Sequence, residues 1–199
     1  MGQVLTGVDE AVAILDRGGV VVIPTETVYG IAARPDAAGV ARIFEVKGRP
    51  SDKSLQLLVD DASLLEVLAR PSEAAKALAR AFWPGPLTLV VPANDAAPQA
   101  VRTNDTIGLR QPAHPVALEL LARTGPLAAS SANRSGEHAA TTIEGIHDVF
   151  GDLVDGYVDG GYIDESASTV VALIDDEPTF LRVGVLSEAA VKSALGRSI

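Results

Sequence analysis

A short run of β-branched residues is the feature that most constrains how this chain can fold. The run is Val20-Val21-Val22-Ile23, and it lies between Gly18-Gly19 and Pro24. Consecutive apolar residues of this kind, bounded by glycine and proline, predict a buried strand that ends at the proline. The rest of the chain must therefore supply elements that pack on this strand.

The remaining periodicities predict helices and strands that mix without a strict βαβ rhythm. Helices are expected at about 8–17, 37–46, 115–123, 143–150 and 188–195, with two more after the caps Asp61 and Ser72. Asp36 is expected to cap the helix at 37–46. Strands are expected at 55–59, 87–91, 106–110, 127–129, 156–159, 169–174 and 179–182. This order predicts an α/β fold of the α+β kind, in which helices pack on one twisted mixed sheet, as a single domain over 1–199.

The charge balance favours a small-molecule site over a nucleic-acid surface. The chain has 26 acidic and 16 basic residues, a net charge of −10. Sequence-independent nucleic-acid binding needs a large basic surface to neutralise phosphates. A small anion held by a few focused cations is easier for such a chain to bind.

Other parts of the composition exclude several classes of protein. The chain has no cysteine, which excludes a disulfide framework, thiolate metal ligands and a cysteine nucleophile. No stretch approaches the roughly 18 apolar residues of a membrane span. The first residues lack a basic region followed by an apolar run, so no signal peptide is predicted. We therefore expect a cytoplasmic protein that makes no contact with a membrane.

Two common nucleotide motifs and the common zinc motifs are missing from the sequence. Neither the P-loop nor the glycine-rich dinucleotide fingerprint occurs, and no pair of histidines has metal-ligand spacing. The histidines, His114, His138 and His147, are scattered. Each is more typical of a surface or supporting residue than of a metal ligand.

The segment Pro24-Thr25-Glu26-Thr27-Val28-Tyr29-Gly30 directly follows the predicted buried strand. A strand end holds polar residues rigidly while the loop exposes them, which suits a ligand pocket. If the segment stays extended, Thr25 and Thr27 face one side and Glu26 the other. An ordinary strand-to-helix loop explains the same residues, and the sequence leaves both interpretations open.

Three cations follow the helix at 37–46, at Lys47, Arg49 and Lys53. Cations near a helix C-terminus are favoured by the helix dipole, so solvated charge is one explanation. Phosphate binding is the other, because Gly48 permits a sharp bend and arginine offers a planar fork to phosphate oxygens. The sequence alone favours neither.

Two further sets of polar residues are expected at strand ends. Ser130-Ser131-Ala132-Asn133 follows the predicted strand at 127–129, in a turn that can hold an anion or be an ordinary turn. Arg110 and Arg182 each end a predicted strand. A buried arginine requires a partner, which is either an internal carboxylate or a ligand anion.

Taken together and in order, these segments resemble the YrdC/Sua5 family, the threonylcarbamoyl-adenylate synthases of tRNA modification. The matching segments begin at Gly18, Lys47, Pro84, Leu109, Ser130, Ser168 and Leu181. The resemblance implies a YrdC-like domain with a concave ligand cleft. It also implies that L-threonine, bicarbonate and ATP are converted to threonylcarbamoyl-AMP and diphosphate, with Mg²⁺ bound through the phosphates.

The same resemblance implies roles for individual residues. The implied catalytic residues are Lys47, Arg49, Ser131 and Asn133. The implied ATP contacts are Arg49, Lys53, Thr106, Ser131 and Arg182. The implied threonine contacts are Thr27, Arg110 and Ser168. Downstream transfer proteins are the expected protein partners, tRNA contact is expected to be weak or indirect, and no protein-bound metal is expected.

The chain departs from the family pattern at three places. Ser54 stands where many relatives have proline, Leu57-Leu58 where some have a histidine near threonine, and Ala139 where some have a serine. These departures leave amino-acid specificity open. The alternatives are a YrdC-like RNA-binding module, and a carbamoyl-adenylate-handling protein without threonine specificity.

Overall fold

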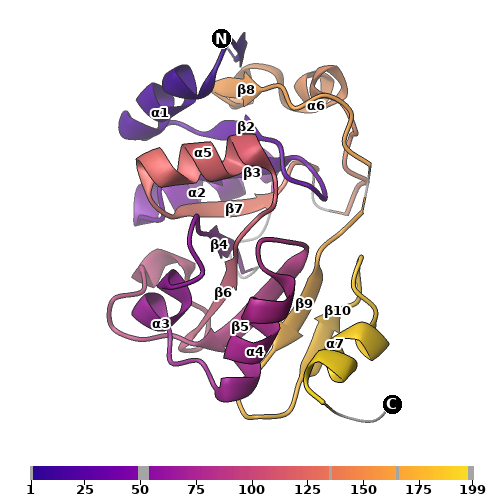
Figure 1. The fold of residues 1–199 in the computed structure, drawn as a ribbon. Helices are drawn as coiled ribbons and strands as arrows, with labels where there is room; N and C mark the ends of the chain where they lie inside the picture. The colour runs from indigo at the N-terminus through magenta and orange to yellow at the C-terminus, as the bar shows by residue number, and fades with distance from the viewer. Residues whose placement is uncertain (1, 49–53, 135, 165, 197–199) are drawn as a thin grey trace.

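One mixed sheet with helices on both of its faces forms the body of the molecule (Figure 1). The computed structural model describes residues 2–48, 54–134, 136–164 and 166–196. The strands are β1 (Gln3–Leu5), β2 (Val21–Ile23), β3 (Gly30–Ala33), β4 (Gln56–Leu58), β5 (Leu87–Pro92), β6 (Thr106–Arg110), β7 (Leu127–Ser131), β8 (Gly156–Val158), β9 (Thr169–Ala172) and β10 (Thr179–Arg182). The helices are α1 (Val8–Asp16), α2 (Ala37–Lys47), α3 (Leu64–Leu68), α4 (Glu73–Phe82), α5 (Pro115–Thr124), α6 (Ile143–Phe150) and α7 (Glu188–Ala194), with 3-10 turns η1 (Gln99–Val101) and η2 (Gly151–Leu153).

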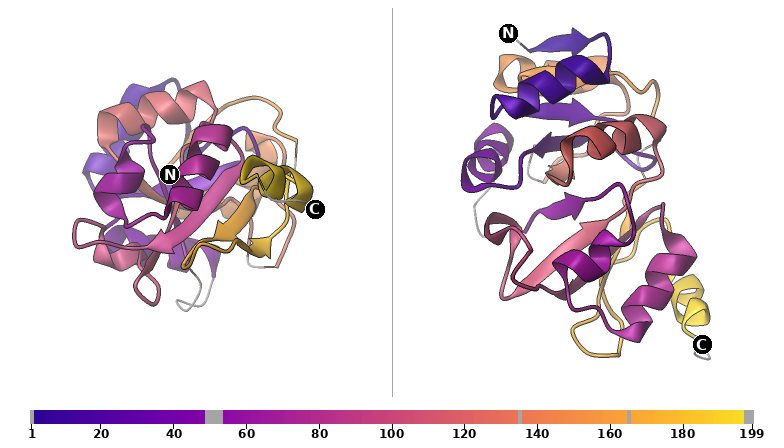
Figure 2. Two further views of the ribbon diagram at one scale, coloured as in Figure 1. Left: turned by 60° about the horizontal axis from the view of Figure 1, so that its bottom comes forward. Right: turned by 60° about the vertical axis from the view of Figure 1, so that its left-hand side comes forward.

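The ten described strands follow the order β1-β8-β2-β3-β7-β4-β6-β5-β9-β10. Parallel pairs occur at β1/β8, β2/β8, β4/β6 and β5/β9, and the other neighbours are antiparallel. The mixed sheet that the sequence predicts is therefore confirmed. The first and last strands are its two edges, so the ends of the chain lie at opposite ends of the molecule (Figures 1 and 2).

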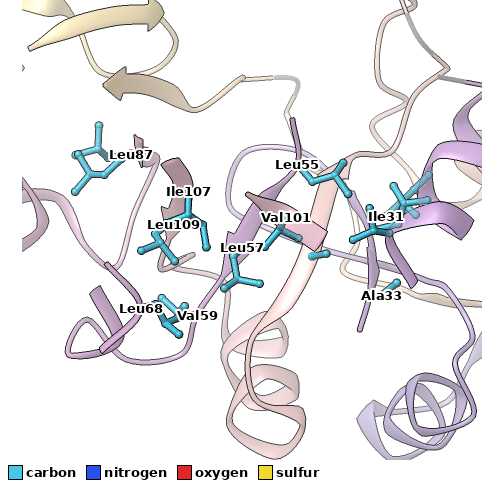
Figure 3. Close-up of a cluster of buried hydrophobic side chains, with 14 of the residues drawn as sticks. Ile31, Ala33, Leu55, Leu57, Val59, Leu68, Leu87, Val101, Ile107 and Leu109 are labelled. Atoms are coloured by element: carbon cyan, nitrogen blue, oxygen red, sulfur yellow. The ribbon is translucent and has the colours of Figure 1, made fainter. Parts of the chain in front are cut away.

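Strict alternation along the strands divides the apolar residues between two cores. In the opening run, Val20 and Val22 join the larger core, whereas Val21 and Ile23 join the smaller one. Successive strand residues point to opposite faces, so a strand with helices on both sides must be apolar throughout. Figure 3 shows part of the larger core, where side chains from 55–59 meet Val101, Ile107 and Leu109.

The helices cover the two faces unequally. Residues of α2, α3, α4, α6 and α7 belong to the larger core, which extends along most of the sheet. The smaller core draws helix residues from α1 and α5 alone, and its strand residues go no further than Leu58 of β4. Among the described residues, no helix covers this face beyond β4, and the strands from β4 to β9 are left open there.

Several sequence expectations need correction. Residues after Pro24 were expected to lead into a helix, but β3 intervenes and forms a hairpin with β2. Gly30-Ile-Ala-Ala33 contains one β-branched residue, and it is a strand because β2 and β7 bond it on both sides. The strand expected at 127–129 continues to Ser131, so Ser130 and Ser131 lie in β7 and not in a turn.

The helix caps were partly predicted. Asp36 accepts a hydrogen bond from the Gly39 amide, and Ser72 caps α4 through the Ala75 amide. Asp61 caps no helix, because α3 begins after Ser63 and the Asp61 carboxylate instead accepts from the Ser63 amide. The short strand β1 at the N-terminal edge was not predicted from the sequence.

Candidate functional site

A cleft of about 580 Å³ lies on the face of the sheet that α1 and α5 leave open. Its floor follows one cross-strand row, in which Ala129 pairs with Gln56, Gln56 with Gly108, Gly108 with Val90, and Val90 with Ala172. Three of these five residues carry no side chain or only a methyl group. The floor is therefore low, and a ligand can lie close to the sheet.

Gly108 is the point where a side chain can be added to this floor. A Cβ built there would meet Thr88, Gln56 and Val90 at 3.7 to 3.8 Å, which is ordinary van der Waals contact. We expect Gly108→Ala to fold normally and Gly108→Leu to fill the cleft. Substrate affinity should fall at least about tenfold in the leucine variant, because displaced ligand atoms lose their contacts with the floor.

Calorimetric titration with ATP, the nucleotide that the family resemblance implies, and thermal unfolding together test this prediction. The alanine variant is the control, since it adds one methyl group where there is room. Equal ATP affinity in the wild type and Gly108→Leu, with both folded, would show that ligands do not lie on this part of the floor.

One side of the cleft is built around the buried ammonium group of Lys47. Lys47 is the last residue of α2 and is 3% exposed. The next residue, Gly48, has the left-handed conformation with φ 55°. The Lys47 Nζ donates to the Ser131 carbonyl oxygen and, at 3.4 Å, to Asn133 Oδ1. Ser131 Oγ also donates to Asn133 Oδ1 at 2.5 Å. Thus Lys47 fixes Ser131 and Asn133, and both of these line the cleft.

The other buried cation is Arg110, at the end of β6. It is 2% exposed and lines the cleft, and its Nη2 donates to Glu26 Oε1 at 2.7 Å and to Thr27 Oγ1 at 2.8 Å. The Nε donates to the Gly85 carbonyl. Burial lowers the pKa of Arg110, while the Glu26 charge acts in the opposite direction. The Nη1 has no hydrogen-bond partner among the described residues and is available to an anion.

The loop between β2 and β3 supplies the partners of Arg110. Thr25 turns inward, where its hydroxyl donates to the Val28 carbonyl at 2.6 Å and lies 3.0 Å from the Thr27 hydroxyl. The expectation that Thr27 and Glu26 face opposite sides is wrong, because both contact the same Arg110 nitrogen. The loop is curved by its own hydroxyl bonds and is not extended. Tyr29, also buried, donates to the Gly161 carbonyl at 2.7 Å and forms part of the core.

The far side of the cleft contains Ser168 and Arg182. Arg182 ends β10, and its guanidinium donates to the Ser168 carbonyl at 2.9 Å and to Ser168 Oγ at 2.8 Å. The pKa of Arg182 is lowered, first by partial burial and second by the positive charge of Arg110. Within the described part of the chain no carboxylate forms an ion pair with Arg182. The two arginines therefore lie in each other's field, and among the described residues Glu26 is the one carboxylate that forms an ion pair with either of them.

Thr106 lies at the rim in a tight turn. Thr103 and Thr106 exchange backbone hydrogen bonds at 2.9 Å, and the two residues between them, Asn104 and Asp105, have φ of 48° and 60°. Positive φ at both central positions is typical of a two-residue hairpin turn, which asparagine and aspartate tolerate. The turn brings Thr103, Asn104 and Thr106 to the cleft wall.

Apolar side chains complete the wall beside this turn. They are Leu55, Val101, Val170, Ile174 and Leu181. An apolar wall with a few hydroxyl groups next to two arginines is suited to a ligand that has a flat ring and an anionic group.

The structure brings most of the predicted site residues together. Ser131, Asn133, Thr106, Arg110, Ser168 and Arg182 all line the cleft. Thr27 and Lys47 do not line the cleft, but each is hydrogen-bonded to a residue that does. Thr27 accepts from Arg110, and Lys47 donates to Ser131. Arg49 and Lys53 lie outside the described residues, so their roles stay predictions.

Gln56 and Thr88 are among the lining residues that were not predicted from the sequence. Thr88 donates to Gln56 Oε1 at 2.8 Å, and both side chains reach the cleft floor. Of the departures from the family pattern, Ser54 bonds to Thr103 Oγ1 at 3.0 Å and Ala139 lines the cleft. Leu57 and Leu58 are core residues on opposite faces of β4.

His114 lies behind the site, close to Glu26. Its Nδ1 is buried without a hydrogen-bond partner in the described structure. Burial lowers the pKa of His114 below 6.5, and the nearby Glu26 charge opposes this shift. The folded protein thus binds a proton at this ring less readily than the unfolded chain does.

That pKa predicts a dependence of stability on pH. The preference of folded His114 for the neutral form favours folding above pH 6.5 and is lost as the pH falls through the lower folded-state value. We expect His114→Leu to unfold less steeply with acid than the wild type when melting temperatures are measured between pH 8 and pH 5. Parallel melting curves for the two proteins would contradict this prediction.

The described residues contain neither a metal-binding cluster nor a membrane-spanning helix. No group of three or more histidine, aspartate or glutamate side chains there is arranged to hold a metal ion. No helix in the same part of the chain is long and apolar enough to span a membrane.

The fold and the cleft define an α/β protein with an arginine-lined cleft on the open face of a mixed sheet. A family model for Sua5, YciO and YrdC proteins, described as telomere recombination, matches residues 13–184. The chain therefore belongs to the Sua5/YciO/YrdC family, and the resemblance seen in the sequence is confirmed.

Individual relatives are similar over most of the chain. Threonylcarbamoyl-AMP synthase of Bacillus subtilis strain 168 is 41% identical over 194 residues, which cover 94% of this chain and 56% of that protein. The protein of the same name from Coxiella burnetii strain RSA 493 is 37% identical, covering 80% of this chain and 88% of its own length. The chain thus spans little more than half of the Bacillus relative.

Solved structures share the fold closely. Sua5 of Pyrococcus abyssi, crystallised in complex with L-threonine, has a TM-score of 0.90 and 37% identity, covering 98% of this chain and 61% of that one. YciO of E. coli has a TM-score of 0.84 and 27% identity, covering 94% and 96%.

Proposed function

We propose that this protein is an L-threonylcarbamoyladenylate synthase. It would convert L-threonine, bicarbonate and ATP to threonylcarbamoyl-AMP and diphosphate, the adenylate used to make N6-threonylcarbamoyladenosine in tRNA. Relatives that bear the name of this enzyme support the proposal, as does the threonine complex of a structural neighbour.

The observation that carries the proposal is the distribution of positive charge in the cleft. Arg110 and Arg182 line it and Lys47 lies directly behind. In the described part of the chain, Glu26 is the one carboxylate that forms an ion pair with either arginine. This is a local exception in a chain of net charge −10. Such a site favours two anions held side by side, as the reaction requires.

The chemistry explains why the cations are needed. The neutral threonine amine adds the carbon dioxide formed from bicarbonate, and the amine proton leaves with the bicarbonate hydroxide as water. An oxygen of the resulting N-carboxylate then attacks the α-phosphorus of ATP. A new oxygen–phosphorus bond forms, the bond to the bridging oxygen breaks, and its electron pair leaves with diphosphate. Both reactants are anionic, so the cations offset their repulsion and stabilise charge on the leaving group.

The residues divide naturally between the two substrates. Arg110 would bind the threonine carboxylate through its unused Nη1, with Thr27 and Ser168 beside it. Thr106, Ser131 and Arg182 would contact the nucleotide, with Arg49 and Lys53 on the triphosphate. Lys47 and Asn133 would hold Ser131 against the reacting groups. Orientation of this kind supplies much of the acceleration in reactions of two bound substrates.

The remaining parts of the proposal concern the metal, the partners and the compartment. Glu137 is the one carboxylate among the described lining residues, so Mg²⁺ would be held by the ATP phosphates and not by a protein cage. Downstream transfer proteins would receive the adenylate, tRNA contact would be weak or indirect, and the compartment would be cytoplasmic. We also propose that 1–199 acts as one domain, because the site takes residues from strands across a single sheet.

A turnover assay tests the proposed function. Purified protein is incubated with ATP, bicarbonate and each amino acid in turn, and diphosphate release is measured. We expect release that requires both threonine and bicarbonate. Release with several other amino acids would favour a carbamoyl-adenylate-handling enzyme without threonine specificity, which the altered residues at 54 and 58 make worth testing. No release, together with tight tRNA binding at moderate salt, would favour an RNA-binding module.

A further inference from the structure

The polar residues on the cleft floor form a connected chain of hydrogen bonds. Arg182 donates to Ser168 Oγ at 2.8 Å, Ser168 Oγ lies 3.3 Å from Thr88 Oγ1, and Thr88 donates to Gln56 Oε1 at 2.8 Å. These hydrogen bonds lead from β10 through Ser168, which directly precedes β9, and Thr88 of β5 to β4. Ser168 is 2% exposed and Thr88 is 3% exposed.

The direction of each hydrogen bond in this chain follows from its donors. A guanidinium can only donate, so it supplies the hydrogen at the Ser168 end. Thr88 has one hydroxyl hydrogen, and the bond to Gln56 uses it. Ser168 must then donate to Thr88, which turns the Gln56 carbonyl oxygen toward β5.

This direction determines what Gln56 offers to a ligand. With Oε1 turned to Thr88, the Nε2 group and its two hydrogens lie on the side of the cleft. No described residue accepts a hydrogen bond from Nε2, and its neighbours in the cross-strand row are Gly108 and Ala129, which are too small to cover it. The amide is therefore a fixed, uncovered donor on the floor.

We propose that Gln56 is a specificity-determining residue whose Nε2 donates to a carboxylate-type oxygen of the carboxylated amino acid. The anionic class of the acceptor follows from the surroundings, since Arg110 and Arg182 both line the cleft and, among the described residues, Glu26 forms an ion pair with Arg110 alone. Thr88 and Ser168 are positioning residues that act through Gln56. This inference rests on the proposed function and adds to it a contact on the threonine side.

The test is calorimetric titration of L-threonine into protein saturated with α,β-methylene-ATP, with and without bicarbonate. Gln56→Met keeps the length of the side chain and removes the donor, and Gln56→Glu places a negative charge there. We expect threonine affinity to fall about tenfold for Gln56→Met and about a hundredfold for Gln56→Glu, with nucleotide affinity unchanged. If the variants lose threonine affinity without bicarbonate, the oxygen that accepts from Gln56 belongs to the α-carboxylate. If the loss requires bicarbonate, that oxygen belongs to the N-carboxylate.

Two controls separate specific effects from general ones. Gln3→Met makes the same change at an exposed position on edge strand β1 and should leave threonine affinity unaltered. Thr88→Val should reproduce much of the Gln56→Met loss, while Thr88→Ser, which keeps the hydroxyl, should restore affinity.

Three outcomes would overturn the proposal. One is unchanged threonine affinity in both Gln56 variants, and another is a loss confined to nucleotide affinity, which would place the acceptor on ATP. Normal affinity in Thr88→Val would refute the positioning chain. If the wild type binds no threonine, the proposed function fails as well, whereas a normal wild type with unaffected variants refutes this inference alone.

Discussion

Replacing Lys47 by methionine should lower turnover by about 10²- to 10³-fold while the protein stays folded. The Lys47 ammonium group is buried and bonds to the Ser131 carbonyl and to Asn133 Oδ1. Methionine has similar length and no charge, so it fits the space but donates to neither oxygen, and Asn133 Oδ1 keeps the Ser131 hydroxyl as its donor. The side chains of Ser131 and Asn133 are then held less firmly, and the positive charge beside the proposed phosphate position is lost.

Steady-state diphosphate release measures this effect, and circular dichroism checks the fold. The matched control is Lys76→Met on α4, where the lysine forms ion pairs with Glu66 and Glu73 at the surface. That change should leave turnover within about twofold, since such pairs contribute little. Equal activity in the two variants would remove Lys47 from the site.

The second large effect is expected on stability, at Glu26. Glu26→Ala should destabilise the protein by about 3 kcal/mol, because it leaves the buried Arg110 guanidinium without its carboxylate. The Glu26 side chain is 23% exposed, but Arg110 is 2% exposed and cannot turn to water. The second carboxylate oxygen also accepts from the Ala113 amide at 2.9 Å, and that bond would be lost too.

Urea denaturation followed by circular dichroism gives the free energy of unfolding. Glu188→Ala is the matched control, since Glu188 forms a solvent-exposed ion pair with Lys192 on α7, and its loss should cost no more than about 0.5 kcal/mol. If the two glutamate variants lost the same stability, Arg110 would not depend on Glu26. The free energy of unfolding of Glu26→Gln should lie between those of the wild type and Glu26→Ala, because an amide oxygen can still accept a hydrogen bond from the guanidinium.

Local patterns in the sequence predict much of the fold. The β-branched run at 20–23 and the caps Asp36 and Ser72 depend on neighbours close in the chain, and the structure has each of them. Strands β1 and β3 could not be predicted in this way. They are short, and they are strands because distant segments bond to them, as Ser131 pairs with Gly30 across a hundred residues.

In the candidate site, too, features that depend on nearby residues could be predicted and features that depend on distant segments could not. Lysine and arginine in an acidic chain indicate an anion site. The sequence left open whether Arg110 pairs with an internal carboxylate or with a ligand anion, and the structure pairs it with the carboxylate of Glu26. The sequence could not predict that Glu26 is the partner of Arg110, because this contact joins the loop after β2 to the end of β6. Gln56 and Thr88 have no local pattern that suggests a site. Their contact follows from the register between β4, β6 and β5.

The cleft itself arises from how far two helices extend. Helices α1 and α5 pack together over β2, β3, β7 and the end of β4, and among the described residues no other helix extends that layer. Where the smaller core ends, at Leu58, the residues on the same face of the sheet change from apolar to polar ones. The polar residues are Gln56, Thr88 and Arg110. The change in residue type along one continuous sheet marks the boundary between core and binding site.

Mass spectrometry with labelled bicarbonate tests the central claim most directly. The purified protein is given ATP, L-threonine and ¹³C-bicarbonate, and the nucleotide products are analysed. We predict a threonylcarbamoyl-AMP product that is one mass unit heavier than the product from unlabelled bicarbonate, and that is lost in Lys47→Met. A folded wild-type protein that consumes no ATP, or that forms a nucleotide product without the label, would contradict the assignment of this cleft as a threonylcarbamoyl-adenylate site.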